Sequence, residues 1–140
     1  MKKILLAAFG LTSVFAAKAQ NVHVQNIGCQ TVIVYFIASQ MPSCANPIVN
    51  NSAGYSVAPG TTLDLSMYPS GPFPAISWSG ALAAGCEFSH IKFVDPSLNW
   101  GDALHDPCFG LPPVVGPEPG CGVTLQAGAW NPTDVDVQIL

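Results

Sequence analysis

The chain has 140 residues and a formal net charge of −4, and only 9% of its residues are charged. It has no arginine, and from Gln20 onward a single lysine, Lys92, stands against eight acidic residues, a net charge of −7 with neutral histidines. The length indicates one domain. The charge excludes nucleic acid as a partner and disfavours anionic membrane surfaces, because both require a cationic protein surface.

Residues 1–19 predict a cleaved secretory signal peptide. Two lysines near the start precede an apolar run over residues 4–17, which is shorter than the roughly 20 residues of a membrane-spanning helix. Residues 17–19 (Ala-Lys-Ala) fit the small-x-small pattern of a signal peptidase site. We therefore expect Gln20 to begin the mature chain and residues 20–140 to form one domain that is secreted or placed in the periplasm or cell envelope.

The predicted elements after the signal peptide are nearly all β-strands. Residues 31–37 (TVIVYFI) are apolar, β-branched or aromatic almost throughout, which predicts a central strand buried on both faces. Residues 63–67 (LDLSM) and 135–139 (VDVQI) alternate apolar and polar side chains, which predicts strands with one buried face. Further strands are expected over residues 22–27, 47–57, 75–79, 87–94 and 123–125.

One of these strands needs an irregularity. In residues 87–94, Phe88 is out of register with Ile91, and a β-bulge near Ser89 and His90 would reconcile them. No window after the signal peptide has a sustained helical period. Seven to nine short strands at intervals near ten residues therefore predict a mostly antiparallel, disulfide-containing β-sandwich, with a small barrel as the weaker alternative.

The five cysteines predict disulfide bonds, because an exported chain meets an oxidising environment. Five is an odd number, so we expect two bridges and one free thiol. We predict a Cys108–Cys121 bridge because the segment between them has four prolines and three glycines, and closing it would contribute about 3 kcal/mol. A Cys44–Cys86 bridge is the second predicted pair and leaves Cys29 free, although the count alone leaves other pairings open.

The polar segment 95–106 is a candidate calcium site. Calcium takes oxygen ligands from carboxylates, amides and carbonyls, and the segment offers such side chains at Asp95, Asn99, Asp102 and Asp106. Their spacing differs from that of an EF-hand loop. The alternative is a solvated loop in which these side chains cap turns.

Trp100 in the same segment is a candidate platform for carbohydrate. An exposed indole flanked by the hydrogen-bonding side chains of Asn99 and Asp102 would match the apolar and polar faces of a sugar, and Tyr68 from another loop would extend the platform. The alternative is that Trp100 folds back onto the core, where large aromatic side chains usually lie.

Catalytic patterns are weak in this chain. The three histidines are His23, His90 and His105. The nearest nucleophile–base set, Cys108 and His105 with Asp102 or Asp106, lies too close together in sequence for the usual assembly from distant elements. The chain lacks the GxSxG, HExxH and phosphate-loop motifs. We therefore expect a protein that is not an enzyme.

Together, these features predict an exported, non-catalytic structural or protein-interaction module. Its partner would bind through loops or edge strands, and the terminal segments 21–27 and 135–140 are candidates for strand exchange or self-association. The alternative is a carbohydrate-binding module that uses residues 95–106, with or without calcium. A small secreted hydrolase is the second alternative. No cofactor other than calcium and no membrane span is expected.

Overall fold

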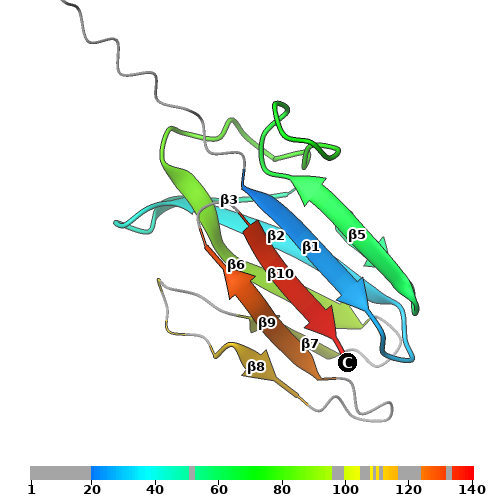
Figure 1. The fold of residues 1–140 in the computed structure, drawn as a ribbon. Helices are drawn as coiled ribbons and strands as arrows, with labels where there is room; N and C mark the ends of the chain where they lie inside the picture. Colours follow the sequence, from blue (N-terminus) through cyan, green and yellow to red (C-terminus); the bar gives the residue numbers. More distant parts are fainter. Residues whose placement is uncertain are drawn as a thin grey trace, which may run out of the picture.

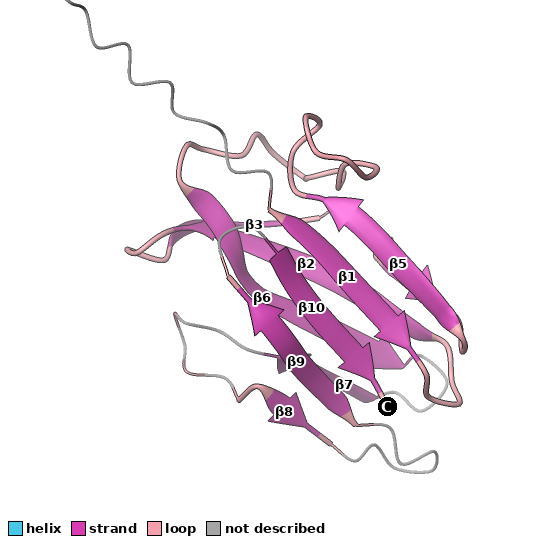
Figure 2. Ribbon diagram, in the orientation of Figure 1, coloured by secondary structure: helices cyan, strands magenta, loops and turns pink. Residues whose placement is uncertain are grey.

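The computed structural model describes residues 20–50, 53–95, 100–104, 108, 110, 112–116, 124–131 and 134–140. The predicted signal peptide lies outside these residues. Every regular element in the described part of the chain is a β-strand, which confirms the all-β prediction (Figure 2).

The described residues contain ten strands in two sheets, which is more than the seven to nine predicted. Sheet A has the order β5 (Thr61–Ser66), β1 (Asn21–Asn26), β10 (Asp134–Ile139), β9 (Leu125–Trp130) and β8 (Val114–Val115). Sheet B has the order β3 (Ala45–Val49), β2 (Val32–Gln40), β6 (Cys86–Asp95) and β7 (Trp100–Leu104), with β4 (Tyr55–Val57) also paired to β2. Three differences raise the count: residues 47–57 divide between β3 and β4, β7 forms within the polar segment 95–106, and β8 interrupts the Pro/Gly-rich segment after Cys108. One predicted strand, over residues 75–79, does not form.

The terminal strands β1 and β10 are neighbours inside sheet A, which lies in front of sheet B in Figure 1. They run parallel, and Val22 pairs with Val135 and Val24 with Val137. The remaining strand pairs of both sheets are antiparallel. Because β5 flanks β1 and β9 flanks β10, neither terminal strand offers an open edge for exchange with another subunit.

The strict alternation in β1, β5 and β10 sorts their side chains between two environments. The valines of β1 and β10 and Leu65 of β5 are buried in the core, and the polar residues between them lie on the opposite face because the side-chain period of a strand is two. The unbroken apolar sequence of β2 has another consequence. Its inner residues Val34 and Phe36 are fully buried, while Ile33 and Tyr35 on the other face are half-buried.

Aromatic side chains from sheet B and from a loop pack together in the core. Phe36 of β2 lies 5.9 Å from Phe88 of β6, measured between ring centroids, and Trp78 lies 6.2 Å from Phe88. The Trp78 indole N–H donates to the carbonyl of Met67 at 3.1 Å. Burying each such side chain contributes about 1.5–3 kcal/mol.

Three buried amide side chains serve backbone groups where the strand ladders end. Gln20 Nε2 donates to the carbonyl of Asn131 at 2.8 Å, and its Oε1 accepts from the Phe88 N–H at 2.8 Å. Asn50 Oδ1 accepts from the Phe36 N–H at 2.7 Å. These bonds satisfy polar groups that would otherwise be buried without partners, at a cost of about 1–3 kcal/mol each.

Asn26 is the third buried amide, and it is fully enclosed. Its Nδ2 donates to the carbonyls of Gln30 and Val57, both at 2.8 Å, and its Oδ1 accepts from the Gly28 N–H at 3.0 Å. One side chain therefore joins the turn after β1 to the end of β4.

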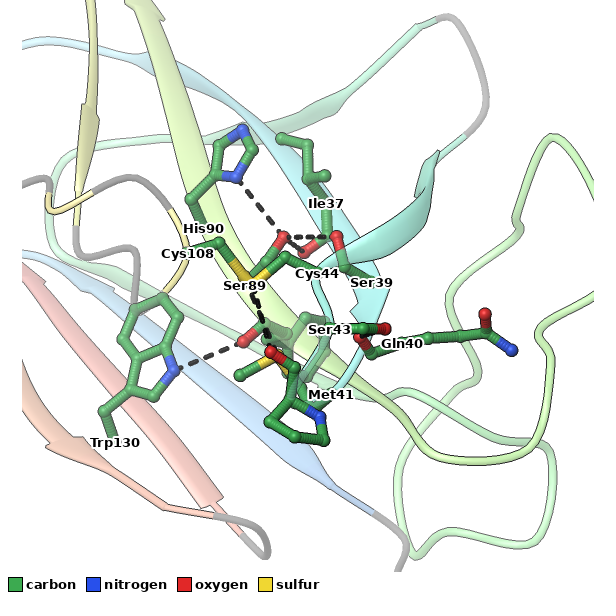
Figure 3. Close-up of a disulfide and its surroundings, with 12 residues drawn as sticks. Ile37, Ser39, Gln40, Met41, Ser43, Cys44, Ser89, His90, Cys108 and Trp130 are labelled. Carbon is green, nitrogen blue, oxygen red and sulfur yellow. Dashed lines mark hydrogen bonds between the residues drawn. A yellow bond between two sulfur atoms is a disulfide. The ribbon is translucent and has the colours of Figure 1, made fainter.

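The predicted β-bulge in β6 is confirmed. Ile37 of β2 pairs with His90, and the next pair skips Ser89. The fully buried Ser89 hydroxyl accepts from Ser39 Oγ at 3.1 Å and donates to the Ile37 carbonyl at 3.3 Å (Figure 3). Its oxygen also lies 3.3 Å from His90 Nδ1. This network explains how two serines are accommodated at the end of an otherwise apolar strand pair.

The disulfide predictions require correction. The structure pairs Cys44 with Cys108, shown in Figure 3, so the predicted Cys108–Cys121 and Cys44–Cys86 bridges are both wrong. Cys86 is a free, buried thiol, and Cys29, predicted free, is disulfide-bonded. Cys86 points into the core at the start of β6, whereas Cys44 lies in the turn after β2. The prediction favoured cysteines that are close together in the sequence. A disulfide stabilises more when it closes a longer loop, and the observed separation of 64 residues corresponds to about 4 kcal/mol.

The predicted strand over residues 75–79 is not a strand. This segment instead makes one isolated bridge to each sheet, between Ala75 and Ser66 and between Trp78 and Asn50. The Ser79 N–H and hydroxyl both donate to the Val49 carbonyl, at 3.1 and 2.9 Å. The segment thus bonds to the ends of β5 and β3, and it covers backbone groups at one edge of each sheet.

Candidate functional site

The outer face of sheet A carries three polar rows that cross β5, β1 and β10. The strand register places these residues opposite one another as Ser66–Asn21–Asp134, Asp64–His23–Asp136 and Thr62–Gln25–Gln138. Every position is polar because the intervening apolar residues of each strand face the core. Three alternating segments that are far apart in the sequence therefore combine to form one polar face.

His23 occupies the centre of this face. Its Nδ1 lies 2.7 Å from Asp64 Oδ1, and the two side chains are 31% and 40% exposed. An ionised carboxylate only accepts hydrogen bonds, so with Asp64 ionised the imidazole Nδ1 is the donor of this bond. Asp136 is the register partner of His23 on the other side, and the imidazole therefore lies between two acidic strand positions.

The two outer rows are also hydrogen-bonded across the strands. Ser66 Oγ donates to Asn21 Oδ1 at 2.9 Å, and Asn21 Nδ2 donates to Asp134 Oδ1 at 3.3 Å. In the third row, Gln138 Nε2 donates to Gln25 Oε1 at 3.5 Å. These bonds restrict the rotamers of the polar side chains before any ligand arrives.

A hollow of about 450 Å³ lies over the second and third rows. It is lined by His23, Gln25, Thr62, Asp64, Gly128, Asp136, Val137 and Gln138. At Gly128, an added Cβ would lie 3.3 Å from Asp136 Cβ, which is a tight contact. The glycine therefore keeps the β9 side of the hollow open.

Phe73 forms an aromatic rim next to His23. Its ring lies 5.2 Å from the imidazole, with the two planes at 90°. The backbone N–H of Phe73 donates to Ser66 Oγ at 3.1 Å, so the loop after β5 is attached to the first polar row. An aromatic ring therefore packs against His23, which is one of the residues that line the hollow.

The predicted calcium ligands fall only partly within the described residues. Asp95 is buried at the end of β6, and Asp102 is exposed on β7, where its Oδ1 accepts from the Ala103 N–H at 2.7 Å. Asn99 and Asp106 lie outside the described part. Within the residues that the structure describes, no three His, Cys, Asp or Glu side chains are arranged to hold a metal ion.

The structure separates Tyr68 from the predicted platform at Trp100. Trp100 pairs with Asp95 at the end of β6, whereas the Tyr68 hydroxyl donates to the carbonyl of Cys86 at its start, at 3.3 Å. A ten-residue strand is about 30 Å long, so the two residues do not form one surface. Burial raises the pKa of Tyr68, and the nearby Cys86 and Glu87 raise it further.

The weak nucleophile–base set of the sequence also loses its nucleophile. Cys108 is bonded to Cys44 and has no thiolate to offer, and His105 and Asp106 lie outside the described residues. The structure does bring another histidine, His23, next to a carboxylate from a distant element, that of Asp64.

Sequence reasoning missed the outer face of sheet A as a site. The alternating segments around His23, Asp64 and Asp136 each indicated an exposed polar row. Their association depends on which strands are neighbours, and the parallel pairing of β1 with β10 was not predicted. The detectable sign was three strictly alternating segments with acids or a histidine at the exposed positions.

The chain matches no family model, no curated protein and no solved structure. In the described part of the chain, helices that are long and apolar enough to cross a membrane are absent. The geometry of the site is therefore the basis on which a function is proposed below.

Proposed function

We propose that this protein is an exported, non-catalytic binding module that holds its partner on the outer face of sheet A. In this proposal the two sheets form a β-sandwich that serves as a rigid scaffold, and the predicted signal peptide directs export. The observation that supports it is the hollow around His23, whose polar side chains come from three different strands of one sheet.

The topology favours a face over an edge as the recognition surface. Both terminal strands pair on each side within sheet A. The segment over residues 74–79 bonds to edges of both sheets. Strand addition needs a free row of backbone N–H and C=O groups, whereas binding to a face needs only side chains, which sheet A presents in ordered rows.

A bulky substitution on each sheet tests the proposal. Thr62 lines the hollow and Ser56 lies on β4 of sheet B, and both are exposed hydroxyl residues on strands. Cosedimentation of the purified protein with extracellular and envelope material of the producing cells is expected to be lost in Thr62→Arg and retained in Ser56→Arg. Equal binding by both variants would show that the outer face of sheet A is not the binding site. Failure of the unmodified protein to bind would show that it is not a binding module for this material.

The segment over residues 95–106 is a second candidate for ligand contact. It is supported by the β6–β7 pairing, which brings Trp100 opposite Asp95 at the end of the hairpin. If this segment is the site, Trp100→Ala abolishes binding while Thr62→Arg does not, and binding through calcium is removed by EDTA.

A hydrolase is the third candidate, because Asp64 and Asp136 line one hollow on either side of His23. Hydrolysis of glycosides uses two carboxylates that flank the bond to be broken. Release of reducing ends from polysaccharides, abolished by Asp64→Asn, would establish it. Binding without any release would support the non-catalytic module.

A further inference from the structure

We propose that the ligand held in the hollow around His23 is a glycan chain that carries no acidic groups. This inference rests on the proposed function and adds the chemical class of the ligand. It follows from three properties of the hollow: the hydrogen-bonding groups on its floor, the absence of an apolar centre among them, and the sign of its charge.

The floor of the hollow offers donors and acceptors side by side. The amides of Gln25 and Gln138 each have two donor hydrogens and an acceptor oxygen, and the carboxylates of Asp64 and Asp136 accept only. A sugar hydroxyl both donates one hydrogen bond and accepts others. Alternating amide and carboxylate groups therefore suit a ligand with many adjacent hydroxyls.

A protein partner fits this face less well. Protein interfaces place their binding energy in a desolvated centre rich in aromatic and apolar side chains. The three rows across β5, β1 and β10 consist of polar residues throughout, and the Phe73 ring packs against His23. An aromatic ring beside a polar floor matches a sugar, which has one apolar face and a periphery of hydroxyls.

The charge of the face selects among glycans. Asp64, Asp134 and Asp136 lie in the rows, and no lysine or arginine does, since Lys92 lies on β6 of sheet B. A uronate, sulfate or phosphate on the ligand would meet carboxylates in close proximity, which is unfavourable. A neutral polysaccharide avoids this repulsion.

The size of the hollow is consistent with a saccharide unit rather than a whole folded partner. Its volume of about 450 Å³ lies within the roughly 300–1,000 Å³ of small-ligand sites. Gly128 bounds the hollow at β9 without a side chain, so a longer chain has room to continue across the sheet in that direction.

Affinity measurements with the purified protein, expressed from the full chain, test the inference. The probes are a neutral hexose polysaccharide, a polyuronate and a polymer of protonated glucosamine, each measured by calorimetry in low and high salt. We expect binding to the neutral polysaccharide in both salts, little change on adding salt, and at least tenfold weaker binding to the polyuronate.

Two variants and a matched control locate the site. Gln25→Ala is expected to weaken binding about tenfold, because it removes one hydrogen-bonding amide, and Gly128→Val is expected to weaken it at least as much by filling the hollow. Gln40→Ala is the control: Gln40 also accepts one amide hydrogen bond, from Asn46 at 2.8 Å, but lies on sheet B. Binding unaffected by both sheet A variants, or binding to the cationic polymer alone that high salt removes, would overturn the inference.

Chemical treatment of the envelope material distinguishes a failure of this inference from a failure of the proposed function. Periodate destroys the vicinal diols of sugars, and protease destroys proteins. If the envelope material loses its binding capacity after periodate, both proposals stand. If it loses that capacity only after protease, and Thr62→Arg still abolishes binding, the binding face stands and the glycan inference fails.

Discussion

The two faces of β1 contain the same kinds of side chain in opposite environments. On the inner side, Gln20 just before the strand and Asn26 at its end are buried, and each bonds to backbone groups. On the outer side, Asn21 and Gln25 are in contact with solvent and bond to side chains of the neighbouring strands. Residues that are adjacent in the sequence therefore have different roles, because successive side chains of a strand point to opposite faces.

This comparison separates the residues that stabilise the fold from the residues that are available to bind. A buried amide that is removed leaves its backbone partners without water or protein to bond to, which costs about 1–3 kcal/mol per group. An exposed amide that is removed is replaced by water at little cost. Substitutions on the outer face of β1 should therefore cost little stability, whereas substitutions of the buried amides on its inner face should cost more.

The largest expected effect is at Asn26. Asn26→Ala removes the bonds that its amide donates to the Gln30 and Val57 carbonyls and the bond that it accepts from the Gly28 N–H, which also donates to the Ile139 carbonyl at 3.0 Å. Because this network is buried, the substitution is expected to lower the free energy of unfolding by about 3 kcal/mol. The neighbouring Gln25→Ala is the control and is expected to change it by less than about 0.5 kcal/mol. Urea denaturation measures both. Equal effects would show that the two faces do not differ as described.

The second-largest effect is expected for Gln20→Ala, which should lower the free energy of unfolding by about 2 kcal/mol. Gln20→Ala removes the partners of the Phe88 N–H and the Asn131 carbonyl. Asn21→Ala, which removes partly exposed bonds, is the matched control, with an expected change below about 1 kcal/mol. A smaller loss for Gln20→Ala than for Asn21→Ala would contradict the assignment of Gln20 to the core.

The decrease in stability at alkaline pH is expected to depend on Tyr68, which lies at the border of the core. Its raised pKa means that the unfolded chain loses this proton first as the pH rises above about 10. Between the unfolded and folded pKa values the native state binds more protons, so stability falls as the pH increases. In Tyr68→Phe, the decrease in denaturation midpoint between about pH 8 and about pH 11 is expected to be smaller than in the unmodified protein. An unchanged decrease would remove Tyr68 as its cause.

The smallest effect is expected at the His23–Asp64 pair on the outer face. Both side chains are about one-third exposed or more, and such pairs contribute about 0.2–1 kcal/mol. A double-mutant cycle with His23→Ala and Asp64→Ala is expected to give a coupling energy within this range. A coupling above about 2 kcal/mol would mean that the pair belongs to the structural side of the comparison and is less available for a ligand.

Several elements could be predicted because their evidence is local. The half-buried strands around Val22, Leu65 and Val137 follow from a period of two, and the bulge at Ser89 follows from a break in that period. The continuous apolar segment that includes Phe36 indicated a central strand, and Phe36 is fully buried. Each of these inferences needs only residues that are adjacent in the sequence.

The site and the disulfide could not be predicted in the same way. Trp100 and its neighbours were singled out because their residue types lie together in the sequence, whereas the hollow combines His23, Asp64 and Asp136 from three distant segments. Cys44 pairs with Cys108 across 64 residues, for which no spacing rule exists. A search for local clusters misses any site that a sheet assembles.

The sequence by itself determined an all-β chain, its alternating strands and a surface poor in positive charge, because side-chain period and composition act within each segment. The tertiary structure alone decided that β1 lies parallel to β10, that Gln20 and Asn26 are buried, and that three polar rows form one face. Strand order follows from packing and hydrogen bonding between segments separated by up to 113 residues. It also determines whether a polar side chain supports the fold or is available to a ligand.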